Sequence, residues 1–139
     1  MKIGGVTITN AMKRLIVVFS EKTTDRGTLD ELYQLIGDKP RWKQAHDLFT
    51  RIRRKNIEAT RRGDIRLRSQ YCFEEACAKT IYNLPAAHTG RFDPDSPYWI
   101  IPNALVTAHY FGIDPNEIIS AVVNTKPDLA ATDDSTLSG

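Results

Sequence analysis

Residues 40–84 decide the fold and read PRWKQAHDLFTRIRRKNIEATRRGDIRLRSQYCFEEACAKTIYNL. Pro40 stands where the first turn of a helix tolerates proline, and Gly63 supplies a left-handed stop. We therefore predict one helix over residues 40–62. A second helix is predicted from the capping residue Asp64 until Pro85 ends it. The short link at Gly63 favours an antiparallel hairpin or a bent rod.

Each of these two helices carries a packing face. In the first, apolar residues recur in alternating steps of three and four, the spacing of one helix side. They are Trp42, Ala45, Phe49, Ile52 and Ala59. The second helix shares one side among Ser69, Cys72, Phe73, Ala76, Cys77, Thr80, Ile81 and Leu84. The two cysteines match neither a redox pair nor a zinc spacing, so we expect core thiols and no metal or cofactor.

Helix signals continue on both sides of this stretch. Thr28 to Glu31 has the pattern of a capping box and predicts a short helix that ends at Gly37. Downstream, we predict a short turn over residues 98–101, a helix over residues 102–111 that stops at Gly112, and a last helix capped by Asp114. The predicted fold class is all-α, with five to six helices in a single compact bundle-like domain.

The beginning of the chain leaves two alternatives open. Val6 to Thr9 and Leu15 to Phe19 could form a short N-terminal strand or hairpin, or residues 11–22 could form a helix. We treat residues 1–11 as an extension of uncertain status, 12–124 as the helical domain and 125–139 as a disordered acidic tail. The first eleven residues lack the pattern of a secretory signal, and no apolar run could span a membrane, so we expect a cytoplasmic protein.

Composition bounds the function. The chain has 139 residues and a formal net charge of +2, which is too near neutral to indicate a polyanion partner by itself. Locally, residues 51–68 hold eight cations against only Glu58 and Asp64. We predict an exposed basic ridge opposite the packing face, able to bind phosphates or an acidic protein, although a solvated helix face would look the same. Its candidate binding residues are Arg51, Arg54, Lys55, Arg61, Arg62 and Arg66.

A second candidate surface is aromatic. Residues 83–96 are rich in Pro, Gly and Asp and predict a long loop. Phe92 in this loop and Tyr98 and Trp99 after it are candidate binding residues, because such side chains anchor protein interfaces. A second half of the core beneath the loop would explain them equally.

The stretch Ala108 to Ile118 resembles the turn of the helix-turn-helix repressors. That resemblance implies a second helix in the DNA major groove. Here, however, the matching positions would expose Asp114 and Glu117, whose carboxylates repel phosphates. We favour an ordinary bend between two core helices.

Enzymatic activity is the interpretation that the sequence supports least. The sequence contains none of the common phosphate-binding, metalloprotease or nucleophile motifs. His88, beside Arg91, Asp93 and Asp95, could support acid-base cleavage of a phosphodiester. We instead expect a small non-catalytic binding protein with a protein partner, and nucleic-acid binding through residues 51–68 as the alternative. The expected class extends to toxin-neutralising, phage-borne or accessory regulatory factors.

Overall fold

A computed structural model describes residues 2–3, 5–36, 42–83 and 97–123. Within these ranges the chain forms six α-helices, a 3-10 turn and two short strands. In chain order they are β1 (Lys2–Ile3), β2 (Val6–Thr7), α1 (Ile8–Ser20), α2 (Gly27–Leu35), α3 (Trp42–Arg62), α4 (Ile65–Asn83), η2 (Pro97–Trp99), α5 (Ile100–Phe111) and α6 (Pro115–Val122). The predicted all-α class, with five to six helices, is confirmed.

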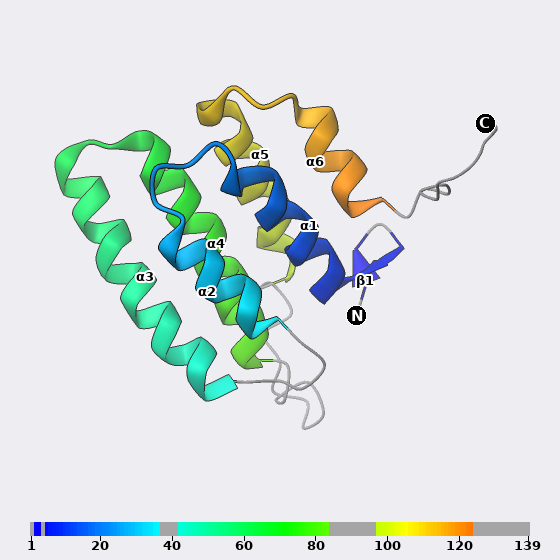
Figure 1. Ribbon diagram of the computed structural model, residues 1–139, viewed down its shortest axis with the longest axis horizontal. Coiled ribbons are helices and arrows are strands. Elements are labelled where there is room, and N and C mark those ends of the chain that lie inside the picture. Colours follow the sequence, from blue (N-terminus) through cyan, green and yellow to red (C-terminus); the bar gives the residue numbers. More distant parts are fainter. Residues whose placement is uncertain (1, 4, 37–41, 84–96, 124–139) are drawn as a thin grey trace.

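Helix α4 is the central element. It packs against α2, α3, α5 and η2, and in Figure 1 α3 lies on one side of it while α1, α5 and α6 lie on the other. The α3–α4 hairpin predicted from Gly63 is present. Because neighbours surround α4 on several sides, even its polar residues Gln70 and Glu74 are fully buried.

A cluster of phenylalanines joins α1, α4 and α5. The rings of Phe19 and Phe73 meet edge to face with their centroids 5.0 Å apart, and Phe19 also lies 6.5 Å from Phe111. Phe19 and Phe73 are both completely buried. Edge-to-face contact of this kind stabilises a core beyond the area it buries.

The predicted helix ends of the second half are confirmed. Gly63 and Gly112 both adopt positive φ angles, 73° and 69°, where a side chain would be strained. Asp64 Oδ1 accepts a hydrogen bond from the backbone N–H of Leu67 (3.1 Å), and Asp114 Oδ1 accepts one from that of Asn116 (2.9 Å). Both carboxylates thus cap the helices predicted from them.

Two helix starts differ from prediction. The capping box at Thr28 is wrong, because α2 begins at Gly27, Thr28 is buried in its first turn, and Glu31 instead pairs with Arg51 on α3. Helix α5 begins at Ile100 rather than Pro102. Pro102 lies in its first turn, where no backbone N–H is needed, so it does not delay the start.

The N-terminal segment is part of the core. Residues Leu15 to Phe19 lie in α1, so the strand alternative for them is wrong, while a small hairpin forms instead between β1 and β2. The expected boundary at residue 12 falls inside α1, and Val6, Ile8 and Ala11 are buried with the rest of the core. Gly5 forms an isolated antiparallel bridge with Val123, which joins the two ends of the described chain.

The packing face of α3 is shifted from the predicted one. Ala45, Ile52 and Ala59 are buried as expected, but Leu48 is fully buried while Phe49 is only half-buried. The face is therefore centred nearer Leu48. Several predicted features lie outside the described residues. They are the side chain of Trp42, Gly37, the 83–96 loop from residue 84 onward and the 125–139 tail. None of the described helices is long and apolar enough to cross a membrane.

Candidate binding surfaces

The basic ridge predicted over residues 51–68 is interrupted by carboxylates. Four of its cations form ion pairs, which are Arg51–Glu31 (2.7 Å), Lys55–Asp25 (2.8 Å), Arg61–Glu58 (3.5 Å) and Arg62–Asp64 (3.9 Å). Two of the acids come from α2 and the segment before it, which sequence spacing could not place beside α3. Half of the eight cations therefore lie beside a carboxylate.

The other four cations of the segment have different surroundings. Arg53 lies over the ring of Phe49 at 5.7 Å, and Arg66 lies over the ring of Phe111 at 4.6 Å. Arg54 and Arg68 are exposed. Among the six candidate ridge residues, Arg61 alone lines the hollow described next. Arg53 and Arg68 also line it, although the sequence did not single them out for binding.

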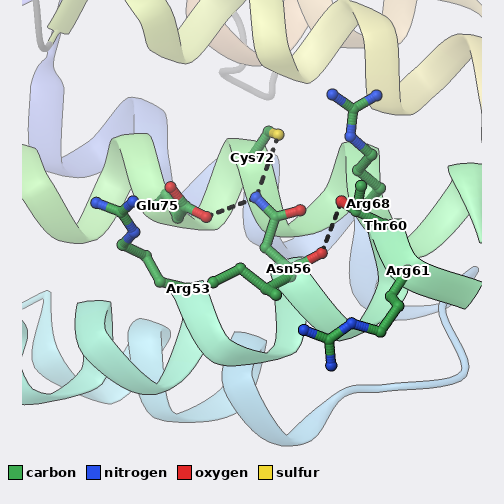
Figure 2. Close-up of a pocket in the computed structure, with 8 residues that line it drawn as sticks. Arg53, Asn56, Thr60, Arg61, Arg68, Cys72 and Glu75 are labelled. Carbon is green, nitrogen blue, oxygen red and sulfur yellow. Dashed lines mark hydrogen bonds between the residues drawn. The ribbon is translucent and has the colours of Figure 1, made fainter.

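A groove runs between α3 and α4. One part of it is a hollow of about 450 Å³, whose lining residues Figure 2 shows. It is lined by Arg53, Asn56, Ile57, Thr60, Arg61, Arg68, Cys72 and Glu75. The guanidinium groups of Arg53, Arg61 and Arg68 point in different directions around it (Figure 2) and do not converge on one point.

The hollow continues toward α5. An adjoining hollow of about 320 Å³ shares Arg53, Cys72 and Glu75 with the first. Its other lining residues are Phe49, Ala76, Lys79, Trp99 and Asn103. We call the two together the α3–α4 groove. One end of this groove is cationic and the other is bounded by aromatic rings.

Asn56 is one of the residues that line the groove. Its Nδ2 donates a hydrogen bond to Glu75 Oε2 (2.6 Å) and lies 3.5 Å from Cys72 Sγ, as Figure 2 shows. Because the amide must present its nitrogen to the carboxylate, its oxygen Oδ1 points the other way. Within the described part of the chain, that buried oxygen has no hydrogen-bond partner.

The outer side of η2 and α5 carries exposed apolar side chains. Tyr98 is 74% exposed, Trp99 59%, Val106 47% and Tyr110 42%. Residues 99, 106 and 110 fall on one side of the helix because they are seven and four positions apart. We call these four residues the aromatic patch. The structure thus places Tyr98 and Trp99 on the surface, whereas Phe92 lies outside the described residues.

A buried polar cluster joins α4 to the segment before α2, and the sequence did not reveal it. Gln70 Nε2 donates to Glu74 Oε2 (2.7 Å) and to the backbone oxygen of Asp25 (3.0 Å), and the Thr23 hydroxyl bonds to Gln70 Oε1. Asp25 Oδ2 in turn accepts from Tyr71 Oη (2.6 Å) and Lys55 Nζ (2.8 Å). These bonds hold the α1–α2 connection against the central helix.

Burial changes the protonation of this cluster. Burial raises the pKa of Glu74 to about 8, and its hydrogen bond from Gln70 offsets only part of that rise. Burial alone would raise the pKa of Asp25 too, but hydrogen bonds from Lys55 and Tyr71 outweigh it and lower that pKa. Glu74 is therefore a neutral acid at pH 7, while Asp25 is a carboxylate.

Two histidines and two cysteines lie among the described residues. Among them no group of three or more His, Cys, Asp and Glu side chains could hold a metal. The ring of His46 packs on Tyr82 and that of His109 on Tyr110. Burial raises the pKa of the Cys77 thiol, as expected of a core cysteine, whereas Cys72 is half-buried. His88, Arg91, Asp93 and Asp95 lie outside the described residues.

The turn between α5 and α6 serves the core. Ile113 and Ile118 are buried, and the Asp114 carboxylate caps α6. Glu117 remains exposed, so the surface that the helix-turn-helix resemblance would turn toward DNA carries a carboxylate.

No protein-family model, no curated protein and no solved structure matches this chain. The candidate surfaces therefore rest on their own geometry and chemistry.

Proposed function

We propose that the protein is a small non-catalytic binding domain that docks another protein through the aromatic patch. The observation that carries this proposal is how exposed apolar side chains are distributed. Four large ones gather on η2 and α5, whereas the others among the described residues stand one to a helix. Those five are Val17, Tyr33, Ile57, Ile65 and Ile119.

The residue types of the patch suit a protein interface. Tyr and Trp bury large areas and lose little side-chain entropy on binding, and they are enriched at the energetic centres of interfaces. Large exposed apolar side chains that gather on one part of a surface often mark a site that a partner covers. The patch also borders the α3–α4 groove at Trp99, so a polar rim lies beside an apolar centre.

The charge pattern favours a protein over a nucleic acid. A surface that binds a duplex is marked by cations clustered on one face, where they can neutralise phosphates. Here Glu31, Asp25, Glu58 and Asp64 pair with cations of the 51–68 segment. The two free cysteines among the described residues suit a reducing compartment, which supports our proposal that the domain acts in the cytoplasm.

Val106 provides the test, because Val17 is a matched control of the same type on another helix. The two side chains are 47% and 53% exposed. Val106→Asp places a charge in the aromatic patch and is expected to abolish capture of a protein partner from an extract of the source cells. Val17→Asp is expected to leave it intact. Both variants should unfold at nearly the wild-type temperature, because exposed substitutions usually change stability by less than about 0.5 kcal/mol.

Three outcomes would contradict the proposal. Equal loss in both variants would show that the patch is not the contact. Loss of capture after nuclease treatment would make nucleic acid the ligand. A wild-type dimer in sedimentation that Val106→Asp converts to a monomer would mean that a second copy of this chain covers the patch.

A further inference from the structure

We propose that the α3–α4 groove is a second binding site, and that its ligand is an extended acidic peptide segment with an apolar side chain at one end. This site differs from the aromatic patch in residues and in chemistry. The two share only Trp99, at the point where the groove ends.

The cationic end of the groove lacks matching negative charge. Within the described ranges, neither Arg53 nor Arg68 lies within ion-pair distance of a carboxylate, and Arg61 pairs only with the exposed Glu58 at 3.5 Å. Glu75 is the single acid among the lining residues, and its Oε2 already accepts from Asn56. Arg53 and Arg68 can therefore accept anionic groups without displacing an ion pair, whereas Arg61 would exchange or share its contact with Glu58.

The spread of the guanidinium groups favours an extended ligand. Since they point in different directions in Figure 2, a single compact anion could not contact all three. From Arg68 to Lys79, both of which line the groove, α4 rises about 16 Å at 1.5 Å per residue. An extended peptide covers that length with about five residues. Arg grips each carboxylate through paired N–H groups.

The aromatic end of the groove favours a peptide over a phosphate chain. Phe49 and Trp99 line this end and suit one apolar side chain. Single-stranded nucleic acids instead need aromatic residues spaced along the groove, and the described lining has them at one end only.

The test uses capped, fluorescein-labelled hexapeptides that carry leucine at one end and three glutamates at the other, in both sequence directions. Their binding is measured by fluorescence polarisation at low salt. The wild-type protein is expected to bind one of them roughly tenfold more tightly than the same peptide with glutamine in place of glutamate, because carboxylates form the stronger bonds to Arg. Added salt should reduce that difference, since these cations are exposed.

Matched arginine variants locate the site. We expect the double variant Arg53→Gln, Arg68→Gln to weaken binding about tenfold, since it removes two charge-assisted contacts. Arg54→Gln, an exposed cation on α3 outside the groove lining, should change the affinity less than about twofold. Thermal unfolding of each variant shows that the fold is retained. Capture through Val106 is measured in parallel, so the failure of one site does not count against the other.

Several results would overturn this inference. The first is that neither acidic peptide binds at low salt. The second is that the glutamine peptides bind as tightly as the acidic ones. The third is that Arg54→Gln weakens binding as much as the double variant does. Tighter binding of an oligothymidylate, with the same dependence on Arg53 and Arg68, would assign the groove to single-stranded nucleic acid instead.

Discussion

Phe73→Ala is expected to lower the free energy of unfolding by about 3 to 5 kcal/mol, which is a large share of the total for a typical domain. Phe73 is fully buried and its ring meets Phe19 edge to face. Alanine leaves a cavity that α1, α4 and α5 cannot close by small movements. Urea unfolding followed by circular dichroism measures the loss.

Phe49→Ala is the matched control for this variant. The sequence pattern predicts the same penalty for it, but the ring is half-buried, contacts Tyr82 and supports Arg53. We therefore expect its loss to be about 1 to 2 kcal/mol. Equal losses of stability in the two variants would contradict the structure, in which Leu48 is buried on α3 and Phe49 is only half-buried.

The second large effect concerns Glu74 and pH. Its pKa is about 8 in the folded protein against an ordinary value of 4.5, so between these values the folded state holds a proton that the unfolded chain has lost. The contribution of Glu74 to stability is therefore complete below 4.5 and falls as pH rises toward 8. At pH 7 the ionisation of Glu74 in the unfolded chain lowers the free energy of unfolding by about 3 kcal/mol, relative to its value below pH 4.5.

Asp25 acts in the opposite direction. Its pKa is lowered in the folded protein, so its contribution is present above its ordinary value of 3.8 and is lost as acid protonates it. The two groups together should give greatest stability at about pH 4 to 5, with losses on both sides. Urea unfolding midpoints, measured at pH values below, within and above this interval, give the stability profile.

Glu74→Gln isolates the effect. The amide stays neutral, so its stability should not decline between about pH 5 and pH 8. Near pH 8 its advantage over the wild type should be about 4 kcal/mol larger than near pH 4. Glu58→Gln removes a carboxyl from an exposed site and should keep the wild-type decline. If the urea midpoint of the wild type does not change between about pH 5 and pH 8, burial does not raise the pKa of Glu74.

Much of the fold follows from local signals. Gly63, Asp64, Gly112 and Asp114 act through their own backbone angles and nearest amides, and such effects are contained in a few neighbouring residues. The pattern on α3 could not distinguish Leu48 from Phe49, because both lie near one helix side. Which of them is buried depends on where α2 and α4 approach.

The polar features could not be predicted because they depend on contacts between distant segments. Glu74 and Glu75 are adjacent in the sequence, and neither falls on the predicted packing face of the second helix. In the structure, Glu74 is buried beside Gln70 whereas Glu75 lines the α3–α4 groove. The ridge prediction found the excess of cations, but the acids opposite Arg51 and Lys55 come from 20 and 30 positions earlier.

The bridge between Gly5 and Val123 bears on how the chain folds. Helices α3 and α4 are sequence neighbours and can pair early, because the loop that joins them is short and its closure entropy is small. The bridge instead needs almost the whole chain to be in place, so it should form among the last contacts. In native-state hydrogen exchange, amides at this junction should open by local fraying, while those of α4 exchange only when the whole domain unfolds.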